Sequence, residues 1–194
     1  FLVIPKQLWI KFIAKKNFQT QEFALSQGVH IINDVFGGSE DLFLLTKKYK
    51  SGLVLMHTPA PPKIMQSKTH LYTNVISDIK NIFQRKSKLL KKYKIPPSKV
   101  WFDPGIGFGK NLQQNLSIMK NIKKFRIEKY GLLIGSSRKS WISGVDKSDV
   151  SQRLGGTIAS VLYCFQRGVN IFRVHDVYEI RQAIAIFQQI ACSK

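Results

Sequence analysis

The chain is poor in acidic residues, in cysteine and in long apolar segments. Its 194 residues contain 11 acidic and 31 basic residues, so the formal net charge is +20 at pH 7. Cys164 and Cys192 have no metal-ligand spacing, and we predict that both are reduced thiols, as is usual in the cytoplasm. No run of about 18 apolar residues is present, so no membrane span is expected. The first five residues are interrupted by Pro5 and are not followed by a small-residue cleavage site, so we expect no signal peptide.

The strong positive charge does not by itself indicate a nucleic-acid-binding protein. Only seven of the basic residues are arginine, and the 24 lysines are scattered, with a local concentration at residues 86–94. Base recognition favours arginine forks and aromatic stacking, and no such array is visible. We therefore predict a solvated lysine-rich surface and no nucleic-acid partner, although such a surface is compatible with a weak attraction for anionic substrates.

Short apolar runs alternate with longer amphipathic stretches along the chain. The predicted strands are Ile31–Asn33, Leu53–Met56, Val100–Asp103, Leu132–Gly135 and Ile171–Val174. Apolar residues at helical spacing predict helices over about 72–93, 112–126, 151–166 and 177–191, the last with Ile180, Ile184, Phe187 and Ile190 facing inward. Strands and helices in strict alternation indicate a parallel sheet covered by helices.

Polar residues follow all five predicted strands, and this pattern favours a barrel over an open sheet. In a (β/α)₈ TIM barrel all strand ends converge on one mouth, whereas an open sheet collects ligands only beside its switch point. A full barrel usually needs about 250 residues. We therefore predict an α/β fold, a (β/α)₈ barrel incomplete at its N-terminus. It has five βα units, or six if residues 8–13 form a strand, and residues 1–194 are a single domain that lacks its first two or three strands.

Residues 103–110, DPGIGFGK, follow a strand and contain three glycines in alternate positions. A P-loop needs one more residue between its glycines and a Ser or Thr after the lysine, and here Asn111 follows Lys110. A dinucleotide fingerprint needs Gly-x-Gly-x-x-Gly, which is also absent. The carboxylate that precedes the glycines belongs to neither motif.

The polar strand ends admit structural and functional interpretations. Asp103 either caps the glycine-rich loop or grips a planar N–H pair of a heterocycle, a bidentate contact that suits a carboxylate. Asn33 is either a turn residue or offers one donor and one acceptor to such a ring. We interpret Asp34 and His57 as structural, and Lys110 as a solvated loop charge.

Two cationic pairs follow the last two strands. Arg138 and Lys139 follow the strand at 132–135, and Arg173 and His175 belong to the final strand and its end. Barrel enzymes commonly bind phosphate with the loops after their last two strands, so these residues predict an anion site. Arg138 could instead be a salt-bridge partner, and Asp176 a helix-start residue. The residues alone indicate a barrel that holds a flat polar heterocycle beside a phosphate or carboxylate.

Five segments in this order resemble the dihydropteroate synthase family. They are INDV at 32–35 with Gly37 and Gly38, LMH at 55–57, DPGIGFGK at 103–110, GSSRK at 135–139 and RVHDV at 173–177. The resemblance covers the chain from about residue 16 to its C-terminus. It implies a (β/α)₈ barrel in folate biosynthesis, a transferase that condenses 6-hydroxymethyl-7,8-dihydropterin pyrophosphate with p-aminobenzoate, with Mg²⁺ present. It also implies a cytoplasmic homodimer, and no membrane partner.

The resemblance also implies roles for individual residues. Asp103 and Asn33 would hold the pterin edge, while Phe108 and Met56 line the pocket. Lys139 would lie between the pterin and aminobenzoate sites. Four further residues complete the expected set: Gly135, Ser137, Arg173 and His175. Of these, Ser137 would meet the aminobenzoate carboxylate, and Arg173 would stack on the pterin and, with His175, bind the pyrophosphate. Asp103, Lys139 and Arg173 are the expected catalytic groups.

The chain also departs from the family pattern. The family's first strand, with an Asn that meets the metal, is absent, so we expect no metal ligand in this sequence. The third-strand run Ser-Ile-Asp-Thr falls on residues 12–15, where Ala14 replaces the pterin-binding Asp. A decayed, inactive pterin-binding remnant is therefore the alternative hypothesis. A pterin-dependent methyltransferase shares the barrel but should lack the Ser-Arg-Lys and Arg-Val-His segments.

Overall fold

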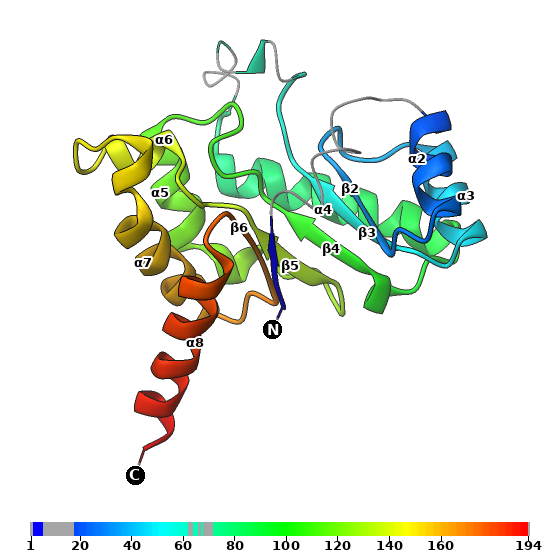
Figure 1. The fold of residues 1–194 in the computed structure, drawn as a ribbon. Coiled ribbons are helices and arrows are strands. Elements are labelled where there is room, and N and C mark those ends of the chain that lie inside the picture. Colours follow the sequence, from blue (N-terminus) through cyan, green and yellow to red (C-terminus); the bar gives the residue numbers. More distant parts are fainter. Residues whose placement is uncertain (1, 6–17, 62–63, 66, 68–71, 194) are drawn as a thin grey trace.

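The structure is a computed structural model that describes residues 2–5, 18–61, 64–65, 67 and 72–193, and it alternates strands and helices (Figure 1). The strands of the described part form one parallel sheet in the order β1-β6-β5-β4-β3-β2. Their bounds are β1 Leu2–Pro5, β2 Ile31–Asp34, β3 Gly52–Met56, β4 Val100–Asp103, β5 Gly131–Ile134 and β6 Ile171–Val174.

Helices follow the strands and cover the outer side of the sheet. The α-helices are α2 Phe18–Ser26, α3 Glu40–Lys48, α4 Val75–Lys92, α5 Leu112–Lys120, α6 Ser140–Ser143, α7 Leu154–Phe165 and α8 Val177–Cys192. The short 3₁₀ helices are η2 Pro97–Lys99, η3 Ile122–Phe125 and η4 Val150–Gln152. Figure 1 shows α2 and α3 near the β2 end of the sheet, and α7 and α8 near β6. This is the α/β architecture of an incomplete barrel, as predicted.

The five predicted strands are confirmed to within one residue at each end. The helix predicted over 112–126 is shorter, because α5 ends at Lys120 and a separate 3₁₀ turn follows Asn121. Strand β1, which the sequence pattern did not predict, pairs with β6. The alternative strand at 8–13, and the position of Ala14, lie outside the described residues.

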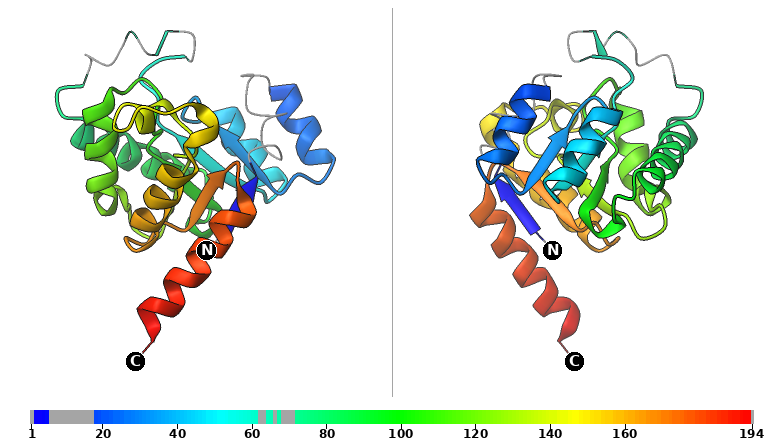
Figure 2. Two further views of the ribbon diagram at one scale, coloured as in Figure 1. Left: turned by 60° about the vertical axis from the view of Figure 1, so that its left-hand side comes forward. Right: turned by 90° about the vertical axis from the view of Figure 1, so that its right-hand side faces the viewer.

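The prediction that Ile190 faces the core is wrong. Ile180 and Ile184 are fully buried, but Ile190 is 70% exposed. The red C-terminal turns of α8 extend away from the rest of the molecule (Figure 2). The apolar spacing therefore continues beyond the point where the helix has a partner.

One apolar cluster packs on the outer face of the sheet and another on its inner face. The outer cluster is the main core, where the Phe83 and Phe102 rings stack at 4.6 Å between α4 and β4. The inner cluster is small, and its members come from five strands: Ile31, Val54, Trp101, Leu133 and Ile171.

Cys164 is a buried free thiol and Cys192 an exposed one, which confirms the prediction of two unbridged cysteines. Within the described ranges, no helix is long and apolar enough to cross a membrane.

Candidate functional site

The predicted site residues lie on the same face of the sheet as the inner cluster. Side chains alternate across a strand, so the residue two positions after each cluster member faces the same side. Those residues are Asn33, Met56, Asp103, Gly135 and Arg173. The alternation thus places five predicted site residues, one from each of five neighbouring strands, in a layer directly above the inner cluster.

Arg173 joins Asn33 and Asp103 across the floor of this layer. Its Nη1 donates to Asn33 Oδ1 at 2.5 Å, and its Nη2 donates to Asp103 Oδ2 at 3.2 Å. Asp103 is 1% exposed, and its Oδ1 accepts the backbone N–H of Gly105 at 2.8 Å. In the described part of the chain, the buried Nδ2 of Asn33 has no hydrogen-bond partner. The floor therefore presents one occupied carboxylate and an amide with unused donor capacity.

Gly135 makes room for the Arg173 guanidinium. A Cβ at position 135 would lie 2.6 Å from Arg173 Nη2. One layer below, a Cβ at Gly131 would lie 2.1 Å from the ring of Trp101. Glycines on β5 and at its end thus leave space for large side chains from the neighbouring strands on both levels.

The glycine-rich loop after β4 is folded by positive backbone angles and by one asparagine. Gly105, Gly107 and Gly109 have φ values of +70°, +77° and +60°, which favour glycine because it lacks Cβ. Asn115 Oδ1 accepts the N–H of Gly107 at 2.7 Å, and its Nδ2 donates to the Lys110 carbonyl at 3.1 Å. The sequence patterns did not single out Asn115, although it follows the loop within about one turn of helix.

We expect Gly105→Ala to destabilise the fold by about 3–5 kcal/mol, because the new Cβ would clash with fixed backbone at an unfavourable φ. That Cβ would lie 2.1 Å from the carbonyl oxygen of His57. Urea unfolding measures the effect. Gly155→Ala is the matched control, because nothing lies within 4 Å of its Cβ position in α7. Equal unfolding free energies for the two variants would contradict this account of the loop.

Lys110 is buried, so its interpretation as a solvated loop charge is wrong. It is 4% exposed, and its Nζ donates to the carbonyls of Phe108 at 2.8 Å, Gly105 at 3.0 Å and His57 at 3.5 Å. Burial lowers the pKa of Lys110 to about 7, although the nearby Asp103 carboxylate acts in the opposite direction. A lysine with three carbonyl partners fixes the glycine-rich loop against the end of β3.

His57 and Tyr72 both lie next to Lys110. His57 is 4% exposed, and burial, together with the charge of Lys110, lowers its pKa to about 3. Its ring centroid lies 5.8 Å from that of Tyr72, and burial raises the pKa of the Tyr72 hydroxyl. The backbone N–H of His57 donates to the Asp103 carbonyl at 2.8 Å. These contacts support the structural interpretation of His57.

The rim of the layer carries the second predicted group of residues. Lys139 Nζ donates to the Ile106 carbonyl and lies 4.4 Å from the centroid of the Phe108 ring. Ser137 Oγ lies 2.9 Å from His175 Nδ1 and accepts the backbone N–H of His175 at 3.2 Å. The loops after β4, β5 and β6 are therefore in direct contact at the mouth of the barrel.

Arg138 is held by a carboxylate and by α7. Its Nε donates to Asp176 Oδ2 at 2.9 Å and its Nη2 to the other carboxylate oxygen. Its backbone N–H donates to Thr157 Oγ1 at 3.0 Å, and its carbonyl accepts Arg153 Nη1 at 3.1 Å. Its φ of +53° is left-handed. Arg138 is thus a salt-bridge partner, one of the two interpretations that the sequence allowed.

A cavity of about 250 Å³ lies between these loops. It is lined by Phe108, Gly135, Ser137, Arg138, Lys139, Val150, Arg173 and His175. Six of the nine predicted substrate-binding residues therefore line one cavity. Two more, Asn33 and Asp103, accept hydrogen bonds from Arg173, which lines this cavity. Met56 belongs to the same layer and is 1% exposed, but it does not line the cavity.

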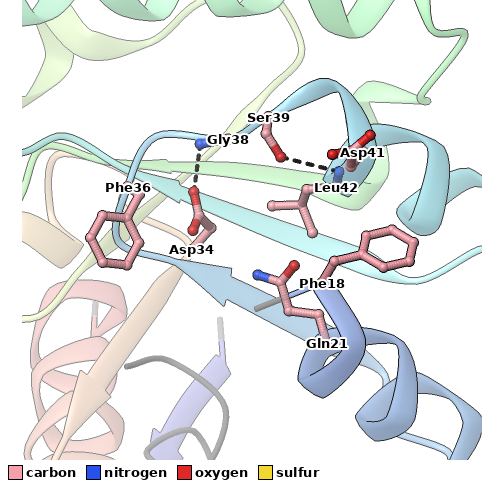
Figure 3. A pocket seen from close by; sticks show the side chains of 8 residues that line it. All are labelled: Phe18, Gln21, Asp34, Phe36, Gly38, Ser39, Asp41 and Leu42. Carbon is pink, nitrogen blue, oxygen red and sulfur yellow. Dashed lines mark hydrogen bonds between the residues drawn. The ribbon is translucent and has the colours of Figure 1, made fainter. Parts of the chain in front are cut away.

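A second cavity, of about 200 Å³, lies on the outer side of β2. Asp34 reaches it because it follows Asn33 and so faces away from the inner layer. Figure 3 shows Asp34 turned toward Gly38, whose N–H donates to Oδ2 at 2.5 Å. Ser39 caps α3 by accepting the N–H of Leu42 at 3.3 Å. Asp34 thus closes the loop after β2, which fits its structural interpretation.

The layer has the chemistry to bind a planar heterocycle beside an anion. A carboxylate and an amide bridged by Arg173 form its floor, whereas Lys139 and His175 line its rim. No group of three or more His, Cys, Asp or Glu side chains that could hold a metal ion exists within the described ranges.

Comparison with known proteins gives a consistent set of relatives. A family model described as pterin binding enzyme matches residues 15–175. The bifunctional dihydropteroate synthase/dihydropteroate reductase of Helicobacter pylori is 34% identical over 172 residues, covering 88% of this chain and 44% of its own. The dihydropteroate synthase of Escherichia coli is 33% identical over 190 residues, covering 97% of this chain and 66% of its own.

Solved structures agree with these matches. The dihydropteroate synthase of Thermus thermophilus in complex with 6HMPPP superposes with a TM-score of 0.85 at 30% identity, over 91% of this chain and 70% of that one. The same enzyme in complex with 4-aminobenzoate gives the same TM-score and identity, over 68% of that chain. The first two curated relatives are matched over 44% and 56% of their length, so this chain spans about half of each.

Proposed function

Because this chain belongs to the pterin-binding enzyme family, we propose that it catalyses the dihydropteroate synthase reaction, as a transferase of folate biosynthesis. In that reaction the amine of p-aminobenzoate replaces the pyrophosphate of 6-hydroxymethyl-7,8-dihydropterin pyrophosphate. The observation that carries the proposal is the inner layer, where Asn33, Asp103 and Arg173 from three strands meet in one hydrogen-bonded group.

The floor of the layer is the proposed pterin site. A carboxylate such as Asp103 can accept a pair of parallel N–H groups from the aminopyrimidinone edge of the ring, and Asn33 has a donor to offer its carbonyl side. Gly135 and Phe108, which line the cavity, complete the pocket walls in this proposal, and Met56 lies in the same layer without lining the cavity. Lys139, whose ammonium lies over the Phe108 ring, stands between the pterin and the aminobenzoate.

The proposed mechanism is electrostatic. The bond between the pterin methylene carbon and the pyrophosphate oxygen breaks, and its electron pair leaves with the pyrophosphate. The positive charge that remains is spread over the pterin, beside the Asp103 carboxylate, and the aminobenzoate nitrogen then attacks the carbon and loses a proton. Arg173 and His175 stabilise the leaving group as its negative charge develops. Ser137, at the same rim, is the proposed partner of the aminobenzoate carboxylate.

Magnesium is the cofactor that the family resemblance predicts. The described residues supply no cluster of metal-binding side chains, so in this proposal the pyrophosphate itself provides oxygen ligands, which Mg²⁺ prefers. No step of the mechanism above depends on the ion.

The proposal is tested by pyrophosphate release from the purified chain with both substrates and Mg²⁺. Release that depends on p-aminobenzoate supports it. Pterin binding without turnover would instead support the alternative of a pterin-binding protein that has lost its activity.

We also propose that the chain forms a homodimer in the cytoplasm, through the apolar surface of α7 and α8. A groove of about 450 Å³ there is lined by Leu154, Ile158, Leu162, Glu179, Gln182, Ala183, Ile186, Phe187 and Ile190. Ile186 and Ile190 are 57% and 70% exposed, and exposed apolar patches of this kind often mark interfaces. The two free thiols are compatible with a reducing compartment.

Sedimentation velocity tests the dimer. We expect the chain to sediment as a dimer and Ile190→Asp to sediment as a monomer, because a charge in an apolar interface must be desolvated. Val145 is 64% exposed and lies outside this groove, so Val145→Asp is the control variant and should remain dimeric. A monomeric unmodified chain at high concentration would contradict the proposal.

A further inference from the structure

The two groups proposed to hold the heterocycle are already bonded to a side chain of the protein itself. Arg173 Nη1 donates to the Asn33 amide oxygen, and Arg173 Nη2 donates to one Asp103 oxygen. The other Asp103 oxygen accepts the Gly105 N–H. The side chains of Arg173 and Asp103 are 10% and 1% exposed, so little solvent separates the pair. A heterocycle cannot use this floor while Arg173 remains there.

The guanidinium of Arg173 has the same donor pattern as the ring edge that would replace it. A guanidinium is planar and presents parallel N–H groups on nitrogens joined to one carbon. The aminopyrimidinone edge of a pterin presents a ring N–H and an amino N–H on nitrogens that also share one carbon. Arg173 therefore occupies the floor as an internal substitute for the ring.

The surroundings of Arg173 provide a second position for its charge. Ser137, Lys139 and His175 line the same cavity as Arg173, so a guanidinium released from the floor stays near the rim. An anionic group bound at the rim can accept the N–H groups of the guanidinium and so replace its hydrogen bonds to the floor. A neutral heterocycle offers no anionic acceptor, so the displaced guanidinium loses its ion pair with Asp103 and gains no other.

We propose that Arg173 is a specificity-determining residue that closes the floor to neutral heterocycles and admits those that carry an anionic group. This inference rests on the proposed function, because it takes the floor as the pterin site. It extends that function by giving the free chain a self-bound state. The state discriminates between a pterin pyrophosphate and the corresponding alcohol before any chemistry takes place.

Calorimetric titration with two ligands tests the inference. The ligands are 6-hydroxymethyl-7,8-dihydropterin and its pyrophosphate, both with Mg²⁺, and the proteins are the unmodified chain and Arg173→Met. The unmodified chain should prefer the pyrophosphate. Arg173→Met should bind the alcohol about tenfold more tightly than the unmodified chain does, and the pyrophosphate about tenfold more weakly, since each tenfold change corresponds to about 1.4 kcal/mol.

Two further variants separate the floor contact from the charge of the chain. Arg181→Met removes a positive charge at an exposed position of α8 that does not line the cavity, so its affinity for the alcohol should not change. Arg173→Lys keeps the charge but lacks the planar fork that bridges the two acceptors, so it should also bind the alcohol more tightly. It serves as the second test if Arg173→Met is found to be unfolded in a thermal scan.

Three results would overturn the inference. Alcohol affinity that stays constant or falls in both folded Arg173 variants would show that the arginine does not compete for the floor. An equal gain in Arg181→Met would assign the effect to charge alone. An unmodified, folded chain that binds neither ligand would reject the pterin site and the inference with it, whereas preference for the pyrophosphate without a gain in the variants rejects the inference only.

Discussion

Asp103→Asn is expected to weaken the binding of the pterin pyrophosphate at least a hundredfold, which corresponds to about 3 kcal/mol of binding free energy. Asp103 is the buried carboxylate of the inner layer, and its two oxygens accept N–H groups from Gly105 and Arg173. An asparagine keeps one acceptor but presents an amide donor where the ligand or Arg173 also donates. The pair of parallel hydrogen bonds to the heterocycle therefore cannot form.

The same substitution is expected to lower the free energy of unfolding by about 3–5 kcal/mol, because removing one partner of a buried ion pair leaves the other unpaired. Binding must therefore be measured at a temperature where the variant is folded, as judged by circular dichroism. Asp146→Asn, at an exposed position between α6 and η4, is the control and should match the unmodified chain in both measurements. A folded Asp103→Asn with unchanged affinity would exclude Asp103 from the site.

Lys110→Met is expected to lower the free energy of unfolding by about 2–4 kcal/mol at pH 7, because a buried and a partly buried carbonyl lose their donor. Those carbonyls belong to Gly105 and Phe108 in the glycine-rich loop. Methionine fills a similar volume, so the change tests hydrogen bonding rather than packing. Urea unfolding measures it, and Lys147→Met at an exposed position is the control. Equal stability of the two variants would show that Lys110 does not fix the loop.

The titration of Lys110 gives this prediction a pH signature. The folded chain has a Lys110 pKa of about 7, below the ordinary value of 10.5. Between these values the unfolded chain holds one more proton, so the free energy of unfolding rises with pH by up to about 1.4 kcal/mol per unit. Below pH 7 Lys110 is protonated in both the folded and the unfolded chain, so it adds no pH dependence to the free energy of unfolding. From pH 7 to 9 the unmodified chain should therefore gain stability relative to Lys110→Met, and parallel curves would contradict the assignment.

The strands and the inner layer could be predicted from local sequence pattern. Short apolar runs bounded by polar residues predicted β3 and β4 to within one residue, because a strand buried on both faces needs continuous apolar residues. The convergence of Asn33, Asp103 and Arg173 followed from the barrel topology, since parallel strands end at one mouth. The roles of these residues remain predictions that the variants above test.

The environment of Lys110 could not be predicted, because it depends on contacts between distant segments. Its carbonyl partner His57 lies 53 positions earlier in the chain, and a lysine beside glycines is usually exposed.

Helix α8 illustrates the opposite error, a residue predicted to be buried that is exposed. Its apolar period continues to Ile190, but the spacing shows only which face is apolar and not where the partner of that face ends.

The most direct test of the proposed pterin site is calorimetric titration of the purified chain with 6-hydroxymethyl-7,8-dihydropterin pyrophosphate and Mg²⁺. We predict one binding site with micromolar affinity, which Asp103→Asn weakens at least a hundredfold and Asp146→Asn leaves unchanged. A chain that is folded by circular dichroism and yet releases no heat at any ligand concentration up to the millimolar range would contradict the central claim, that the described strand ends form a pterin site.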